Sequence, residues 1–377
     1  MTVETPAIPE RPHTRWWQSR WLHGALSLAV VALIFGFLFP TVADYGEVWN
    51  TIQAMTGLEA ASLGLVAMWN LASYWPLLTA VQPGLRLREA AVANLASTAI
   101  SNTLPGGAAL GVGATLTMQR SWGIPVPETA LAAVVAGIWN NFAKLGLPIV
   151  ALALLALNGQ AGPGLAVAAL IGLAVLIAAI VVFAVLLRSP ELAASVGAAA
   201  GTAVSAVRRL FRRGPVSGWD ERARRFRAEI IGLLAHRWIR ITVATLVSHL
   251  SLFMVLLVAL RHVGVSNQEV SWQEALAAFS FVRLLSAVPL TPGGLGVVEL
   301  GLTASLGSGL PETTKNQIAA AVLLYRGLTW FAPIPLGIGC WVFWRTNRSW
   351  RRSIAEREAW IGDEADDPEP ARPVARP

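Results

Sequence analysis

The chain has 377 residues, of which 55% are hydrophobic and only 14% are charged. A soluble protein carries about 25% charged residues, so this composition excludes a soluble enzyme, a disordered chain and a secreted disulfide scaffold. The net charge is +7, but the basic residues lie just outside long apolar runs. That placement is typical of a membrane protein and gives no reason to expect nucleic acid as a partner.

Six apolar runs are long enough to cross a bilayer of about 30 Å as helices that rise about 1.5 Å per residue. They cover residues 22–40, 58–82, 128–157, 163–187, 238–260 and 315–344. No cleavage site follows the first run, so we expect that run to remain as an anchor. Two further stretches, 89–119 and 273–310, are each interrupted by Pro-Gly-Gly, and neither half is long enough to span. We predict a re-entrant hairpin in each.

The distribution of arginine orients these segments. With residues 1–21 in the cytoplasm, nearly all arginines between the runs fall on the inner side, as the positive-inside rule requires. The Arg-rich segment 188–237 is expected to lie along the anionic inner leaflet as amphipathic helix. Residues 346–377 are expected to form a disordered cytoplasmic tail. The prediction is an all-α protein of the bacterial cytoplasmic membrane, with both termini inside and a polytopic domain over residues 22–345.

Landmarks recur in the same order in residues 58–157 and 238–344, namely a span, Glu-Ala, Pro-Gly-Gly, Gly-x-Pro and a second span. The same number of residues separates Pro105 from Pro292 and Pro148 from Pro335. The charge map gives the two units opposite orientations. Inverted repeats with broken helices near the midplane are typical of secondary transporters. Chance similarity between alanine-rich segments is the alternative.

Each Pro-Gly-Gly break is a candidate binding site for a lipid phosphate. A broken helix exposes unpaired N–H groups with partial positive charge, and glycine allows both the turn and a close approach of the ligand. The alternative is that Pro-Gly-Gly only ends two half-helices. The candidate residues in the two breaks are Thr291, Pro292, Gly293 and Gly294, and Pro105, Gly106 and Gly107.

Four ionisable side chains lie within apolar stretches: Lys144, Arg283, Glu299 and Arg326. A charge at this depth costs from about 2.5 to more than 10 kcal/mol, so each is expected to face a cavity or a partner. Asn140 shares a helix face with Lys144. We take all five as candidate headgroup-binding residues. The alternative is that Glu299 pairs with Arg326 or Arg283 only to hold the fold.

One set of motifs resembles a known family. The segment 289–299 (PLTPGGLGVVE), the segment 324–326 (LYR) and the spacing of Pro333, Pro335 and Gly337 resemble the flippase-like transmembrane domain of bacterial lysylphosphatidylglycerol synthases. The resemblance covers about residues 20–345. It implies a domain that moves a modified phospholipid between leaflets. Pro292, Gly293, Gly294, Glu299 and Arg326 match the family signature, and no soluble synthase domain is expected here.

The expected function is therefore translocation of a phospholipid or a lipid-linked anionic headgroup. The sequence shows no complete nucleotide loop, no metal-ligand cluster and no Ser-His-Asp order, so we expect neither a cofactor nor an enzymatic activity. Two alternatives stay open: a membrane-embedded transferase with Glu299 as base, and a non-transporting scaffold. The Arg-rich segment 208–240 would then dock a separate synthase or glycosyltransferase. A second copy of the chain also stays open as a partner.

Overall fold

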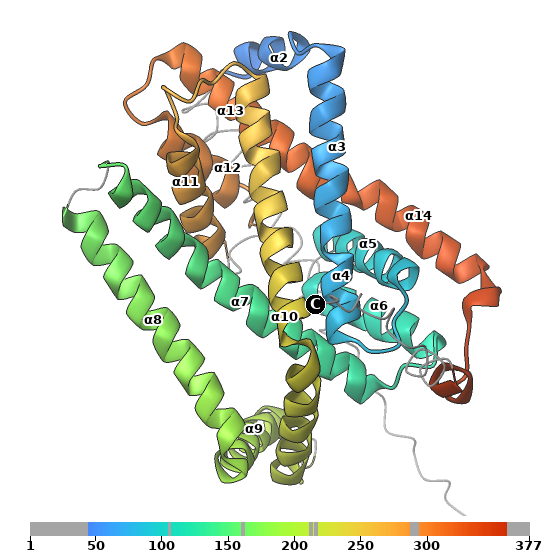
Figure 1. Ribbon diagram of the computed structural model, residues 1–377. Coiled ribbons are helices and arrows are strands. Elements are labelled where there is room, and N and C mark those ends of the chain that lie inside the picture. Colours follow the sequence, from blue (N-terminus) through green and yellow to red (C-terminus); the bar gives the residue numbers. More distant parts are fainter. Residues whose placement is uncertain are drawn as a thin grey trace, which may run out of the picture.

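The structure, a computed structural model, describes residues 44–104, 107–159, 163–210, 214, 218–286 and 294–359, and every regular element among these is helical (Figure 1). The elements in chain order are α2 (Tyr45–Gln53), α3 (Gly57–Ser73), α4 (Trp75–Val81), α5 (Leu87–Thr103), α6 (Gly107–Ser121), α7 (Val126–Leu157), α8 (Pro163–Arg188), α9 (Pro190–Leu210), α10 (Trp219–His262), α11 (Trp272–Leu285), α12 (Val297–Gly307), α13 (Glu312–Arg326), the π-helical η4 (Gly327–Phe331), α14 (Pro333–Thr346) and the 3-10 turn η5 (Arg348–Trp350). The predicted all-α class is confirmed.

Four helical segments of the described chain are long and apolar enough to cross a membrane: α7, most of α8, α10, and the continuous run from α13 to α14. They match four of the predicted spans. The predicted run 58–82 is divided at Tyr74 into α3 and α4, because Pro76 at the start of α4 has no N–H to donate to the preceding turn. The predicted run 22–40 lies outside the described residues.

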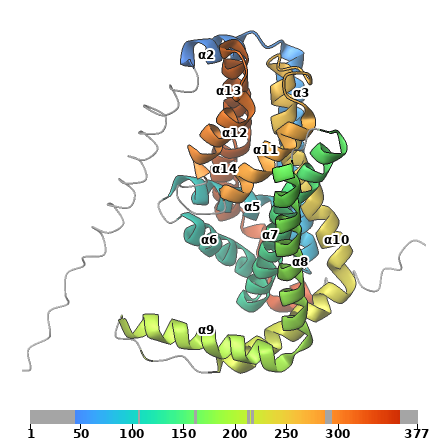
Figure 2. The same ribbon diagram turned by 90° about the vertical axis from the view of Figure 1, so that its left-hand side faces the viewer.

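The Arg-rich connection forms two helices of different orientation. Figure 2 shows α9 lying across one end of the bundle, while α8 and α10 run along it. We predicted an amphipathic segment up to residue 237 and a separate span from residue 238. The structure instead has α10 as one helix from Trp219 to His262. No proline interrupts this stretch, so the helix continues from the basic segment into the apolar one.

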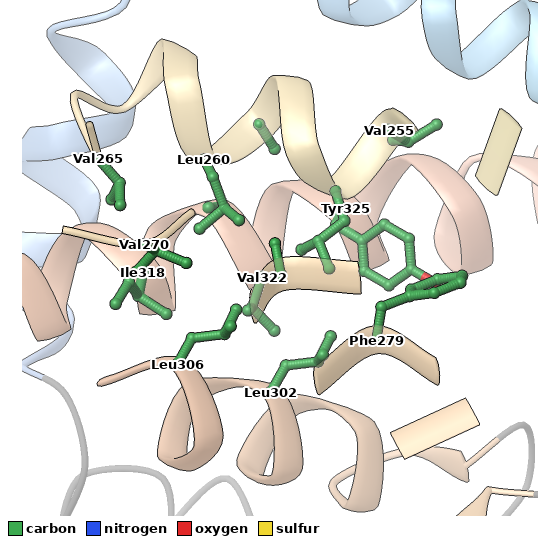
Figure 3. Close-up of a cluster of buried hydrophobic side chains, with 14 of the residues drawn as sticks. Val255, Leu260, Val265, Val270, Phe279, Leu302, Leu306, Ile318, Val322 and Tyr325 are labelled. Atoms are coloured by element: carbon green, nitrogen blue, oxygen red, sulfur yellow. The ribbon is translucent and has the colours of Figure 1, made fainter. Parts of the chain in front are cut away.

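The largest buried cluster fills the space between α10, α11, α12 and α13. Figure 3 shows Leu302 and Leu306 of α12 pointing toward Val322 of α13, with Phe279 and Tyr325 beside them. The rings of Phe279 and Tyr325 meet nearly edge-on, with their centroids 6.5 Å apart. This close packing holds α12 and α13 together and positions the charged residues at their ends.

The two halves of the chain exchange contacts. Helix α5 of the first half packs mainly against α14 of the second half. In the same way, α11 of the second half packs against α7 of the first half. At the first contact, a Cβ on Gly337 would overlap the carbonyl oxygen of Leu95 and the methyl group of Ala99. Glycine at this position therefore lets the two helices approach closely.

Local backbone geometry also recurs between the halves. Gly123 and Gly309 have φ angles of +75° and +76°, and each is followed by a proline at the residue before the next long helix. The side chain of Glu274 accepts from the backbone N–H of Ser271 at 2.8 Å and completes a capping box at the start of α11. Glu89 does the same for Arg86 at the start of α5, at 3.0 Å. These features are local, and sequence patterns predict them for that reason.

The segment after α14 is folded where we predicted disorder. We expected a disordered tail from residue 346, but η5 and a helical turn at residues 354–359 pack below α5 and α7. Arg352 lies 2.7 Å from Glu89, and Arg357 lies 2.6 Å from Glu128. These ion pairs join residues far apart in the sequence, so no local pattern indicates them. Residues 360–377 lie outside the described chain.

Candidate functional site

The break between α11 and α12 has the backbone that its glycines favour. Gly294 and Gly296 have φ angles of +69° and +81°, which side chains with a Cβ rarely adopt. The N–H of Gly296 donates to Oε2 of Glu299 at 2.6 Å, so one N–H group expected to face a phosphate is already satisfied. The other predicted residues of this break, Thr291, Pro292 and Gly293, lie outside the described residues.

Glu299 and Arg326 form a buried ion pair. Arg326 Nε donates to Oε1 of Glu299 at 2.7 Å, and the two residues are 7% and 1% exposed. The guanidinium carbon of Arg326 also lies 5.7 Å from the ring centroid of Trp330. Of the two pairings considered from the sequence, the one with Arg326 is confirmed. Because both oxygens of Glu299 are engaged, the pair is primarily part of the fold.

The α-helix α13 ends at Arg326 and continues as a π-helix. Residues 327–331 form the π-helical η4, and Pro333 and Pro335 follow at the start of α14. A proline ring clashes with the carbonyl one turn earlier, and wider π turns relieve that crowding. Asn102, near the end of α5, donates its side-chain N–H to the Trp330 carbonyl at 3.1 Å. The first helix pair is thereby tied to the irregular turn next to Arg326.

A second charged cluster lies where α7 meets α11. Lys144 and Arg283 are close enough to repel each other electrostatically, and His249 of α10 lies within range of both. In the described part of the chain, no carboxylate lies within ion-pair distance of Lys144 or Arg283. His249 is 5% exposed, its Nδ1 donates to the Thr245 carbonyl at 3.0 Å, and its Nε2 has no hydrogen-bond partner among the residues that the structure describes. The same holds for the buried Nε of Arg283.

The two charged clusters are neighbours. Tyr325 is 2% exposed and lies within electrostatic range of Arg283, Arg326 and Glu299. The structure therefore brings four of the predicted residues near one another. Glu299 and Arg326 neutralise each other, whereas Lys144 and Arg283 have no carboxylate partner among the described residues. An anion entering this region meets its strongest attraction at Lys144 and Arg283.

Asn140 was predicted to bind a headgroup together with Lys144, but its side chain bonds to other uncharged groups beside a cavity. Its side-chain N–H donates to the hydroxyl of Tyr74 at 3.2 Å and to the Ala136 carbonyl at 2.8 Å. It lines a cavity of about 350 Å³ between α4, α5, α6 and α7. Asn140 is thus at the edge of this cavity, one helical turn from Lys144.

The first break shows why Gly107 is a glycine. Gly107 starts α6, and a Cβ there would overlap the carbonyl oxygen of Ser101 on α5. Gly111, one turn later, approaches the Ser101 hydroxyl in the same way. The close crossing of α5 and α6 explains Gly107, which favours a fold role over ligand contact at this position. Pro105 and Gly106 lie outside the described residues.

The comparison with protein families agrees with the motifs of the second half. Residues 24–337 match the model of the lysylphosphatidylglycerol synthase TM region. The chain belongs to this family. No curated protein matches the chain. Membership in the family, together with the long apolar helices, shows a multi-pass membrane protein whose domain is linked to lipid modification or translocation.

Several residues of the site were not predicted from the sequence. Gln82 and Tyr74 line the cavity, Asn102 binds the π-helical turn, and His249 lies within electrostatic range of Lys144 and Arg283. A polar side chain in an apolar run is a usable signal for Asn102 and His249, since burying it has a cost. Gln82 carries no such signal because it lies just before the Pro-Gly of a turn.

Proposed function

We propose that this protein moves a lipid with an anionic headgroup across the bacterial cytoplasmic membrane, without chemically changing it. The observation that carries this proposal is that Lys144 and Arg283 lie close enough to repel each other, while no carboxylate of the described chain lies within ion-pair distance of either. Two cations of like sign in a low-dielectric interior repel each other, and a phosphate between them would relieve that repulsion. An arginine can bind such a phosphate with two parallel hydrogen bonds.

The arrangement of the helices supports alternating access. The pair α5–α6 lies toward the α9 end of the bundle, and the pair α11–α12 lies toward the α2 end (Figures 1 and 2). We take these pairs as re-entrant hairpins of an inverted repeat that enter the membrane from opposite sides. The concentration of arginines near α9 supports a cytoplasmic location for that end, and we propose the same side for both termini. Such an arrangement is typical of transporters with a site near the midplane.

The geometry of Glu299 argues against the transferase alternative. A general base needs a free carboxylate oxygen within reach of the substrate. Both oxygens of Glu299 accept hydrogen bonds within the fold, and the residue is 1% exposed. The proposal therefore treats Glu299 as a structural residue and assigns the ligand to Lys144 and Arg283.

The test uses the purified full chain in phosphatidylcholine vesicles that contain a trace of fluorescent phosphatidylglycerol. Wild type should bring the inner-leaflet label into reach of an impermeant quencher. Replacing both cations, Lys144→Met with Arg283→Met, should slow this movement by about tenfold or more, because two charge-assisted hydrogen bonds are lost. The matched control is Lys315→Met, which removes a surface lysine paired with Glu312.

The stability of the same variants gives a second readout. Removing the like-charge repulsion should leave the Lys144→Met/Arg283→Met protein at least as stable as wild type in detergent. Loss of transport in a protein of unchanged stability supports the proposal. Equal transport by wild type and the double variant would overturn the phosphate site. No transport by wild type would favour the scaffold alternative.

A further inference from the structure

The cavity between α4, α5, α6 and α7 is closed at the end that lies toward α9 and exposed elsewhere. At the closed end its lining residues are buried, since Gln82 is 1% exposed and Gln119 is 6% exposed. Val112 of α6 also lines the cavity and is 54% exposed. The hydroxyl of Thr129 on α7 donates to Oε1 of Gln119 on α6 at 2.7 Å. This closing hydrogen bond joins the two helices across the end of the cavity.

Residues 347–359, which follow α14, reach this closed end, and we call them the strap. In Figure 1 the strap, in dark red, lies beside the end of α6. The backbone N–H of Arg352 donates to the carbonyl of Ser121 at 3.0 Å, two residues after the glutamine of the closing hydrogen bond. The guanidinium of Arg357 donates to Glu128 at 2.6 Å, directly before the threonine of that bond. The strap therefore holds the end of α6 and the start of α7 together.

Further contacts place the strap against the other helices that surround this end of the cavity. Arg357 also donates to the carbonyl of Pro83, in the turn between α4 and α5, at 2.7 Å. An ion pair with Glu89 adds the start of α5. Trp350 packs against the buried cluster that contains the lining residue Leu85. The strap thus bridges all four helices at the closed end.

Beyond Trp350 the strap is held mainly by charges rather than by close packing. A second cavity, of about 430 Å³, lies between the strap and the corner that joins α6 to α7. Ile354 of the strap and Val126 at the start of α7 line it and are 52% and 44% exposed. Segments with few buried apolar contacts open locally at a lower cost than the core of a protein. The strap is therefore the part of this end that can detach while the bundle stays folded.

We propose that the strap is a releasable lid on the cavity between α4, α5, α6 and α7. When it is bound, it keeps the ends of α6 and α7 together and closes the cavity at the α9 end. When it is released, Gln119 and Thr129 separate and the cavity opens at that end. The inference concerns access to the cavity and assigns no ligand to it. It rests on the proposed function only for placing this end in the cytoplasm, and it adds the one-sided closure that alternating access requires.

The test measures how fast a cysteine in the cavity reacts with a thiol reagent in the purified full chain in detergent. The reporter is Ala132→Cys, at a lining position that is 6% exposed, in a Cys340→Ser background. Releasing the strap with Arg352→Ala should raise the labelling rate about tenfold or more, because at least one charge-assisted hydrogen bond no longer opposes opening. Arg348→Ala, in an exposed position of the same segment, is the matched control and should leave the rate unchanged.

A second reporter distinguishes opening of the lid from general unfolding. Ala320→Cys places the cysteine in the buried cluster between α10, α11, α12 and α13, where Ala320 is 0% exposed. Its labelling should not change when Arg352→Ala releases the strap. A rise at both reporters would mean that the strap holds the whole fold together and is not a lid.

A milder variant keeps the test decisive if Arg352→Ala fails to fold. Glu128→Gln weakens the other ion pair of the strap, and the Glu128 side chain is 41% exposed, so the neutral amide stays hydrated. This variant should raise the labelling of Ala132→Cys by about twofold to fivefold, as expected for loss of a partly exposed ion pair. An unchanged rate in the folded strap variants would overturn the inference.

Lipid movement in the vesicle assay separates this inference from the proposed function. If release of the strap speeds labelling of the cavity but wild type moves no lipid, the lid stands and the proposed function fails. If wild type moves lipid but labelling does not respond to the strap variants, the lid is wrong and the proposed function stands.

Discussion

The helix pairs α5–α6 and α11–α12 occupy corresponding places in the two halves of the chain, yet they hold their charges differently. In the first pair the buried acid is Glu89, in the first turn of α5. It pairs with Arg352, which follows α14 in the sequence. In the second pair the buried acid, Glu299, starts α12 and pairs with Arg326 inside the bundle. Beside the first pair lies a cavity whose described lining residues carry no charge, whereas Lys144 and Arg283 beside the second have no carboxylate partner within the described chain.

This difference shows that similar backbones serve different tasks. Both pairs begin with a glutamate that caps α5 or α11 and end in a Gly-x-Pro corner that leads into a long helix. The side chains at the breaks then differ. The first pair borders the cavity, and the second contributes Arg283, which we propose to bind a phosphate. Variants of the two ion pairs, Glu299–Arg326 and Glu89–Arg352, test whether the two helix pairs have different roles.

The largest effect is expected at the second pair. Arg326→Ala leaves Glu299 buried without its partner and should lower the free energy of unfolding by about 3–5 kcal/mol. Thermal unfolding in detergent would measure this. Adding Glu299→Gln should recover much of the loss and, because Lys144 and Arg283 remain, should also restore lipid movement. A double variant that is stable but inactive would show that Arg326 contacts the lipid and would contradict the division of roles.

A smaller effect is expected at the first pair. Arg352→Ala should destabilise by about 2–3 kcal/mol, since Glu89 keeps its hydrogen bond from the Arg86 N–H and lies near the end of the bundle. Release of residues 348–359, detected as faster proteolysis after α14, should accompany it. Arg348→Ala, in an exposed position of the same segment, is the matched control. An unchanged proteolysis rate would mean that the ion pair does not hold this segment.

The smallest effect concerns pH at the loop between α10 and α11. Hydrogen bonds from the backbone and side chain of Ser266, and from the Thr314 hydroxyl, hold the pKa of Glu269 below its usual value. The resulting stabilisation is complete above the unfolded-state pKa of about 4.3 and is lost as pH falls through the lower folded-state pKa. Because Glu269 is exposed, Glu269→Gln should cost less than about 1 kcal/mol at pH 7. Its unfolding temperature should approach that of wild type below pH 4.

Features that depend on a few neighbouring residues could be predicted. The apolar runs indicated the long helices α7, α8, α10 and α13–α14. The glycines of the second break indicated a non-helical backbone, which Gly294 has. Two local predictions were wrong in their bounds. The helix α10 continues through residue 238, and residues 348–350 and 354–359, within the expected disordered tail, are helical.

The sequence by itself determined the class of protein, the long helices and the places where helices break, because each follows from hydrophobic length and backbone chemistry within a short window. Only the tertiary structure decided which charges meet. Glu299 had two candidate partners, and the packing of α12 against α13 brought it to Arg326, 27 residues away. Arg352 reaches Glu89 across 263 residues, and Lys144 comes within electrostatic range of Arg283 because α7 packs on α11. Such pairings depend on how each helix is rotated and where it crosses its neighbour, and a sequence pattern specifies the face of a helix but not the helix that it will meet.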